Sequence, residues 1–119
     1  GRMNEITAAF GLIQMKRAPK IFDFKKKLAK KYDQIFENRV IFPDGMESGY
    51  YKYIVFKQKV KLETGYVYDQ PCHKIMKIEA KLPNTDWVST NHVCPPIWYG
   101  WENIDMTVEE LKKELLEME

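Results

Sequence analysis

The sequence is short of the residues that mark several classes of protein. Its two cysteines, Cys72 and Cys94, form no C-x-x-C pair, and the six glycines are never adjacent, so they build neither a G-x-G-x-x-G turn nor a P-loop. No apolar run approaches the roughly 18 to 20 residues of a membrane helix, and the N-terminus shows no apolar stretch with a cleavage site. We therefore expect a soluble, cytoplasmic chain whose thiols are reduced.

A strong excess of one charge is also missing. The 119 residues include 19 Lys and Arg against 17 Asp and Glu, a formal net charge of +2, which by itself does not indicate a nucleic-acid protein. The basic residues concentrate between Lys16 and Lys31, and the glutamates between Glu109 and Glu119 offset them. Aromatic residues do not alternate with these lysines along the sequence, so a solvated helix face is favoured over a nucleic-acid interface. A stand-alone module that binds nucleic acid or another acidic partner through Lys16–Lys31 is the alternative.

Apolar residues recur at helical spacing in two consecutive stretches near the N-terminus. The first follows the potential cap Asn4, and its stripe comprises Ile6, Ala9, Phe10 and Ile13. The second stripe comprises Ile21, Phe24, Leu28, Tyr32 and Ile35. Pro19 lies between them, so we expect either one kinked helix or two consecutive helices that end near Asn38.

The rest of the sequence predicts short strands and two further helices. Tyr50 to Phe56 and Tyr66 to Gln70 are rich in aromatic and β-branched residues and should pair antiparallel, while the prolines restrict residues 93–97 to an extended edge segment. A short helix should run from Leu82 to about Asn91, and Thr107 with Glu110 forms a capping box before a C-terminal helix. The apolar stripe of that helix comprises Val108, Leu111, Leu115 and Met118. The predicted fold is a single α+β domain over residues 1–119, with a small antiparallel sheet of about three strands flanked by helices.

The pairs Cys72-His73 and His92-x-Cys94 contain the ligand types that zinc prefers. Neighbours in an extended segment point to opposite faces, so Cys72 and His73 could bind one ion only after a backbone distortion. The spacing disfavours a metal site and favours free thiols and hydrogen-bonded histidines.

Two tyrosines and a histidine form the most suggestive polar group. Tyr66 and Tyr68 share one side of their predicted strand, and Pro71 ends the pairing just before His73, which we expect in a loop at the edge of the sheet. Phenol and imidazole groups can hold a polyhydroxylated or phosphorylated ligand. Ordinary sheet packing is the alternative for the tyrosines, and a hydrogen bond to a backbone carbonyl is the alternative for His73.

Several motifs, in order, resemble the C-terminal half of DegT/DnrJ/EryC1/StrS aminotransferases, and they span essentially the whole chain. The first and most specific is the R-M-N-E-I-T-A-A-F-G-L-I-Q-M run over residues 2–15. The later ones are Tyr50-Tyr51-Lys52-Tyr53, Tyr68-x-x-Pro71-x-His73, Leu82-Pro83-Asn84 through Pro96-Ile97, and Met106-Thr107. About nine residues join the Tyr50 and Tyr66 segments where many relatives insert a helix, and Pro95 replaces the usual leucine.

The resemblance implies the small C-terminal domain of a dimeric enzyme that depends on pyridoxal phosphate (PLP) and transaminates nucleotide-linked keto sugars. The family's cofactor lysine belongs to a large N-terminal domain that these residues do not include, so this chain alone is expected to bind no PLP, to hold no catalytic residue and to be inactive. The family's cofactor-phosphate asparagine would fall just before Gly1. Arg2 matches the motif arginine, and Tyr68 and His73 match the positions nearest the sugar.

Overall fold

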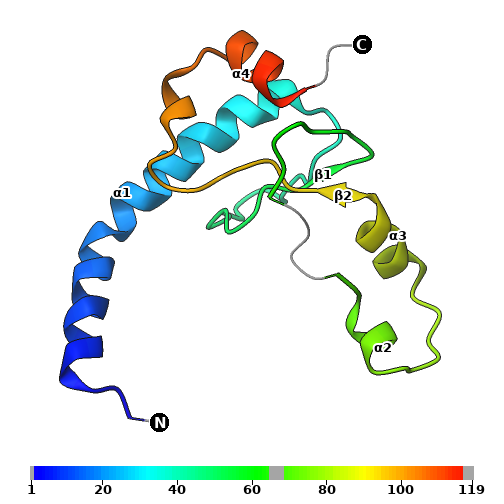
Figure 1. Cartoon of the computed structure of the whole chain (residues 1–119), viewed down its shortest axis with the longest axis horizontal. Coiled ribbons are helices and arrows are strands. Elements are labelled where there is room, and N and C mark those ends of the chain that lie inside the picture. The colour runs from blue at the N-terminus through cyan, green and yellow to red at the C-terminus, as the bar shows by residue number, and fades with distance from the viewer. Residues whose placement is uncertain (1, 65–68, 117–119) are drawn as a thin grey trace.

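The computed structural model describes residues 2–64 and 69–116, and its longest element is the helix α1, Glu5–Ile35. The side chain of Asn4 caps it, accepting a hydrogen bond from the Thr7 amide at 2.8 Å, which confirms the predicted cap. Pro19 lies inside the helix, which changes direction along its length in Figure 1. One bent helix therefore forms instead of two, as expected where proline removes an intrahelical bond without ending the helix.

The core lies against the C-terminal half of α1. Buried residues of this half are Leu28, Ala29, Tyr32 and Ile35. They pack against the 3-10 helix η1, Glu102–Asp105, and the helix α4, Val108–Leu115, whose Leu111 and Leu115 are fully buried. The predicted capping box is present, with Thr107 Oγ1 3.2 Å from the Glu110 amide and Glu110 Oε2 2.9 Å from the Thr107 amide.

The sheet is smaller than the sequence predicts. β1, Val55–Phe56, pairs antiparallel with β2, His92–Val93, and Arg39 adds a single bridge to Val55. The prediction of about three strands is thus not confirmed, although the α+β class is. Of the predicted strand from Tyr50 to Phe56, only Val55–Phe56 forms a strand. Left-handed φ values of 48° at Tyr50 and 50° at Lys57 take the backbone out of the extended conformation on either side of residues 51–56. The predicted Tyr66–Gln70 partner falls partly outside the described residues.

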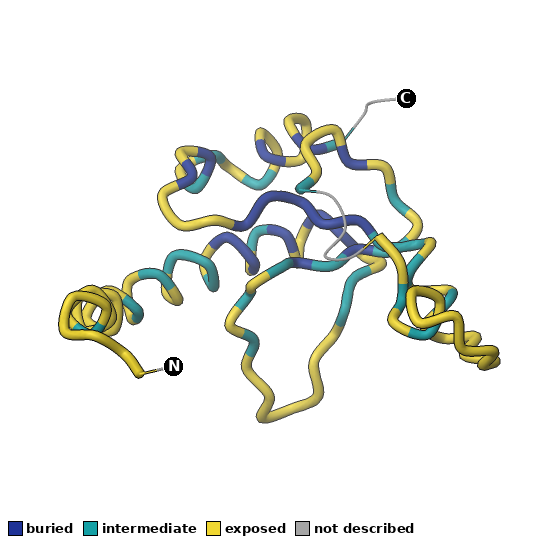
Figure 2. The backbone as a smooth tube through the Cα atoms, turned by 60° about the horizontal axis from the view of Figure 1, so that its bottom comes forward, coloured by how far each residue is buried: buried dark blue, intermediate teal, exposed yellow. Residues whose placement is uncertain are grey.

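An extended segment after β2 crosses the centre of the molecule. Residues 93–97 are all buried, and Figure 2 shows them as a continuous dark-blue stretch between α1 and the other core elements. The hydroxyl of Tyr32 donates a hydrogen bond to the Pro96 carbonyl, and the Lys31 ammonium donates to the carbonyls of Ile104 and Met106. This segment was expected at an edge. Among the described residues it forms no strand beyond β2, as its prolines favour, but it lies inside the core.

Two short helices form a peripheral α2–α3 lobe, which spans residues 72–91. α3, Pro83–Asn91, agrees with the predicted helix, whereas α2, Cys72–Ile75, replaces the loop that was expected around His73. Figure 1 shows the lobe and the N-terminal half of α1 projecting from opposite sides of the core. The lobe is connected to the core through β2. It also contacts the core through Trp87, whose ring centroid lies 5.3 Å from that of Phe56.

The projections make the chain unusually open. Its radius of gyration is 17.4 Å, against about 13.5 Å for a compact domain of this length. Its accessible surface is 9528 Å², roughly 2,700 Å² more than the surface of a compact monomer of this mass. Figure 2 shows that both projections are mostly exposed. Their exposed large apolar side chains are Met3, Ile6, Phe10, Leu12, Ile13 and Met15 at the N-terminus, and Ile75, Met76, Ile78, Leu82, Trp87 and Val88 around the lobe.

Candidate functional site

His73 lies at the contact between α2 and α3. Its Nε2 atom is 3.1 Å from Oδ1 of Asp86, in the first turns of α3, and only 10% of its side chain is exposed. Lys74 approaches the same carboxylate oxygen at 3.5 Å, so Asp86 receives two groups from α2. A hydrogen bond to a carboxylate fixes the orientation of an imidazole and leaves its other nitrogen, Nδ1, for a different partner.

The other two predicted site residues are not seen beside His73. Tyr68 lies outside the described residues. Arg2 is exposed at the start of the chain, ahead of α1, and Figures 1 and 2 both place this end on the opposite side of the core from the α2–α3 lobe. Within this chain, Arg2 and His73 therefore cannot contact one small ligand.

An open groove of about 430 Å³ runs along the lobe on a face that does not include His73. Its lining residues are Gln70, Pro71, Cys72, Asn84, Thr85, Val88, Ser89 and His92. None of these side chains carries a fixed charge, and the surface that they present to the groove is mainly apolar. The groove therefore offers no cation to an anionic ligand and few polar groups to a hydroxyl-bearing one. The sequence motif around Pro71 points to this lobe but gives no sign of the residues that α3 contributes.

The two thiols occupy different environments. Cys72 is exposed in α2, whereas Cys94 is buried in the central extended segment, where burial raises the pKa of its thiol. In the part of the chain that the structure describes, no three His, Cys, Asp or Glu side chains gather closely enough to hold a metal ion. Both histidines have a hydrogen-bond acceptor nearby. His73 Nε2 faces Asp86, and His92 Nδ1 is 2.6 Å from the Val88 carbonyl oxygen.

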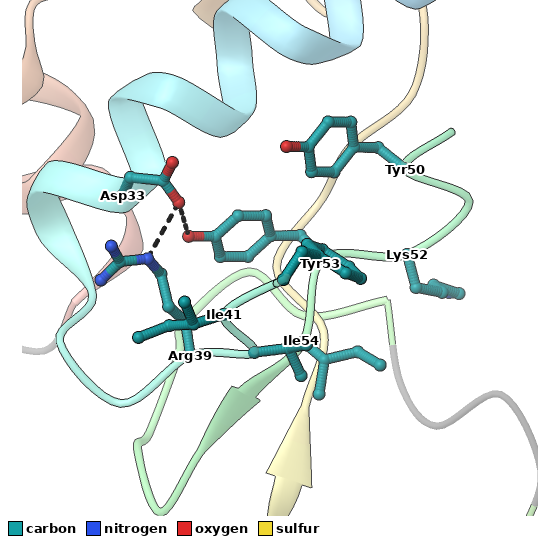
Figure 3. Close-up of a pocket in the computed structure, with 9 residues that line it drawn as sticks. Asp33, Arg39, Ile41, Tyr50, Lys52, Tyr53 and Ile54 are labelled. Atoms are coloured by element: carbon teal, nitrogen blue, oxygen red, sulfur yellow. Dashed lines mark hydrogen bonds and ion pairs between the residues drawn. The ribbon is translucent and has the colours of Figure 1, made fainter. Parts of the chain in front are cut away.

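A second cavity, of about 350 Å³, lies between the end of α1 and the segment before β1 (Figure 3). Asp33 Oδ1 accepts a hydrogen bond from the Tyr53 hydroxyl at 2.7 Å and lies 3.0 Å from Arg39 Nε. Tyr50 reaches the same region from a left-handed backbone position, where Lys25 Nζ donates to its carbonyl at 3.0 Å. The sequence analysis did not predict this group, because Asp33 and Tyr53 are 20 residues apart and no local sequence motif links them.

The cavity at Asp33 does not offer the groups that PLP needs. That cofactor needs a lysine, an acidic partner for its ring nitrogen and backbone N–H groups for its phosphate. The cavity at Asp33 includes Lys52, but the Lys52 ammonium donates to Thr64 Oγ1 at 2.9 Å, and Asp33 is engaged by Tyr53 and Arg39. None of the three longer helices, α1, α3 and α4, begins at this cavity to supply a phosphate cradle.

The chain thus has a small α+β fold with large exposed apolar faces. Of the three predicted site residues, the structure shows only His73 in the lobe. The model of the DegT/DnrJ/EryC1/StrS aminotransferase family matches residues 1–112, and the chain belongs to that family. Comparison with curated proteins and comparison with solved structures gave no significant match. Among the described residues, no helix is both long enough and apolar enough to cross a membrane.

Proposed function

We propose that this chain is the C-terminal small domain of a PLP-dependent aminotransferase that acts on nucleotide-linked keto sugars. The observation that carries the proposal is the family match over residues 1–112. On this proposal, the lysine that binds PLP belongs to a separate domain of the same protein. The chain alone is then inactive.

The open shape supports such a partner domain. Covering the surplus of roughly 2,700 Å² on this chain would bury about twice that area over both partners, at the upper end of the range for large permanent interfaces. The uncovered side chains are apolar along both projections, and exposed apolar patches of this extent mark contact surfaces. We assign the N-terminal projection and the α2–α3 lobe to contacts with the PLP-binding domain and with the second subunit of a homodimer.

Within the assembled enzyme, we assign His73, Tyr68 and Arg2 to the substrate side of the active site. Nε2 of His73 is hydrogen-bonded to Asp86, so Nδ1 is the nitrogen that would contact a sugar hydroxyl or phosphate group. Because Arg2 and His73 lie on opposite sides of this chain, they would serve one substrate only if two subunits contribute to each site. This placement is a reason to expect a dimer.

The direct test compares the parent enzyme with this chain. Amino transfer to a nucleotide-linked keto sugar should require the PLP-binding domain, and the separately produced PLP-binding domain should bind the 119-residue chain in titration calorimetry. A PLP-binding domain that is fully active by itself and does not bind the chain would refute the proposal.

A further inference from the structure

A basic groove separate from the lobe lies between α1 and the segment that precedes α4. Its volume is about 670 Å³, within the range of ligand-binding clefts. Its lining residues are Lys20, Asp23, Phe24, Lys27, Lys30, Lys31, Tyr99, Ile104 and Asp105. Four lysines face two aspartates, so the groove is positive although the chain as a whole is nearly neutral.

Three of these lysines are available to a ligand. Lys31 donates to two backbone carbonyls, but the structure, over the residues it describes, gives Lys20, Lys27 and Lys30 no carboxylate within ion-pair distance. All three are exposed. By contrast, Lys26 on another face of the same helix pairs with Glu47 at 3.0 Å. The positive field of the groove is therefore not cancelled by local pairs.

An exposed aromatic ring completes the groove. Tyr99 is 41% exposed, and its ring meets that of Phe24 edge-on with centroids 5.3 Å apart. The Arg17 guanidinium lies over the Tyr99 ring, 5.9 Å from the centroid. Along the sequence the exposed ring of Tyr99 is far from the lysines of α1, so the sequence alone disfavoured a nucleic-acid interface. The fold brings them together and removes that objection.

The spacing of the lysines selects the kind of ligand. Lys20 and Lys30 are ten residues apart on α1, which is about 15 Å along a helix. A single phosphate cannot contact both, whereas a row of phosphates can. The phosphates of a duplex could contact the lysines, but its bases are stacked on one another and could not stack on Tyr99. A single strand can place phosphates at the lysines and a base on Tyr99 at the same time.

We propose that this groove binds single-stranded nucleic acid, with phosphates along Lys20, Lys27 and Lys30 and a base stacked on Tyr99. The inference is independent of the proposed aminotransferase function. It predicts that affinity falls with salt at a log–log slope of about −2, since three single-strand phosphate contacts contribute about 0.7 each.

The test is fluorescence anisotropy with a labelled oligothymidylate and the 119-residue chain between 50 and 200 mM NaCl. Affinity should fall about 15-fold over this range. The triple variant Lys20→Ala, Lys27→Ala, Lys30→Ala should bring the slope close to zero. A control triple variant that removes the same charge elsewhere, Lys59→Ala, Lys61→Ala, Lys81→Ala, should keep it.

Tyr99 provides the second arm of the test. Tyr99→Ala should weaken oligonucleotide binding roughly 5- to 100-fold, Tyr99→Trp should retain it, and neither change should alter binding of inorganic polyphosphate. Circular dichroism verifies that each variant is folded. Four results would overturn the proposal: the absence of salt-dependent binding, equal losses in the two triple variants, equal effects of Tyr99→Ala on oligonucleotide and polyphosphate, or duplex binding as tight as single-strand binding.

Discussion

The hydroxyl of Tyr53 donates a hydrogen bond to Asp33 across 2.7 Å and so joins the segment before β1 to the last turns of α1. Arg39 Nε, 3.0 Å from the same carboxylate oxygen, balances the charge of Asp33. Tyr53 itself is buried, and its ring packs edge-on against that of Tyr32 at 5.1 Å. A polar contact and an aromatic contact thus anchor one segment to one helix.

This contact predicts a loss of stability at alkaline pH. Burial, followed by the hydrogen bond to Asp33, raises the pKa of Tyr53 well above its usual value near 10. The folded state then retains a proton that the unfolded state releases, so stability is full below about pH 10 and falls as pH rises further. Tyr53→Phe should cost about 1 to 2 kcal/mol at pH 7.5 and should weaken the decline at pH 10.5.

Urea unfolding at the two pH values measures both effects. Burial also raises the pKa of Tyr32, so part of the alkaline loss should persist in Tyr53→Phe. An unchanged alkaline loss in this variant would mean that Tyr53 does not titrate as its burial requires.

The two halves of α1 should respond differently to the same substitution. Leu28 is fully buried in the core, whereas Leu12 is 66% exposed on the N-terminal projection. In the isolated chain, Leu28→Ala should lower the free energy of unfolding by about 2 to 5 kcal/mol, and Leu12→Ala should change it by less than about 0.5 kcal/mol. Thermal or chemical denaturation of both variants provides the comparison. Equal costs would show that the N-terminal half is already packed in the isolated chain.

The thiols predict a difference in chemical reactivity. Cys72 is exposed, while burial of Cys94 raises the pKa of its thiol and blocks access to reagents. Ellman's reagent at pH 8 should therefore modify one thiol rapidly and the second only after denaturant is added. The variant Cys72→Ser should remove the rapid phase. Two rapid phases in the native protein would contradict the burial of Cys94.

Helix ends and apolar faces were the most predictable parts of this fold. The caps at Asn4 and Thr107 act through side chains that bond amides three residues ahead, so they can be recognised locally. Extended segments were predicted less well. Residues 50–54 have strand propensity, but the left-handed backbone at Tyr50 and the partner His92–Val93 depend on tertiary contacts.

The candidate site was predictable only in part. The sequence singled out His73, but its partner Asp86 is thirteen residues later on another helix and has no motif of its own. The apolar stripe of Ile6, Phe10 and Ile13 was read correctly as one helix face, yet it is exposed. Hydrophobic periodicity tells which residues share a face and does not tell what covers that face.

His73 should matter for turnover in the parent enzyme. His73→Ala should lower kcat/KM ten- to hundredfold, equivalent to losing one contact of about 1 to 3 kcal/mol. Lys74→Ala is the matched control, because it removes the other partner of Asp86 and leaves the imidazole in place. Steady-state kinetics and a melting curve should be recorded for each variant. A normal kcat/KM with a lowered melting temperature would make His73 a structural link between α2 and α3.

The most direct measurement is the absorbance spectrum after PLP is added to the parent enzyme and, separately, to this chain. A lysine aldimine of PLP absorbs in the visible range. The parent should show this band and should lose it when a nucleotide-linked amino sugar is supplied, while the 119-residue chain should show no stable band. A stable band on the chain alone that disappears when one of its own lysines is mutated, or a parent protein that forms none, would contradict the assignment of this chain as the small domain of a PLP-dependent sugar aminotransferase.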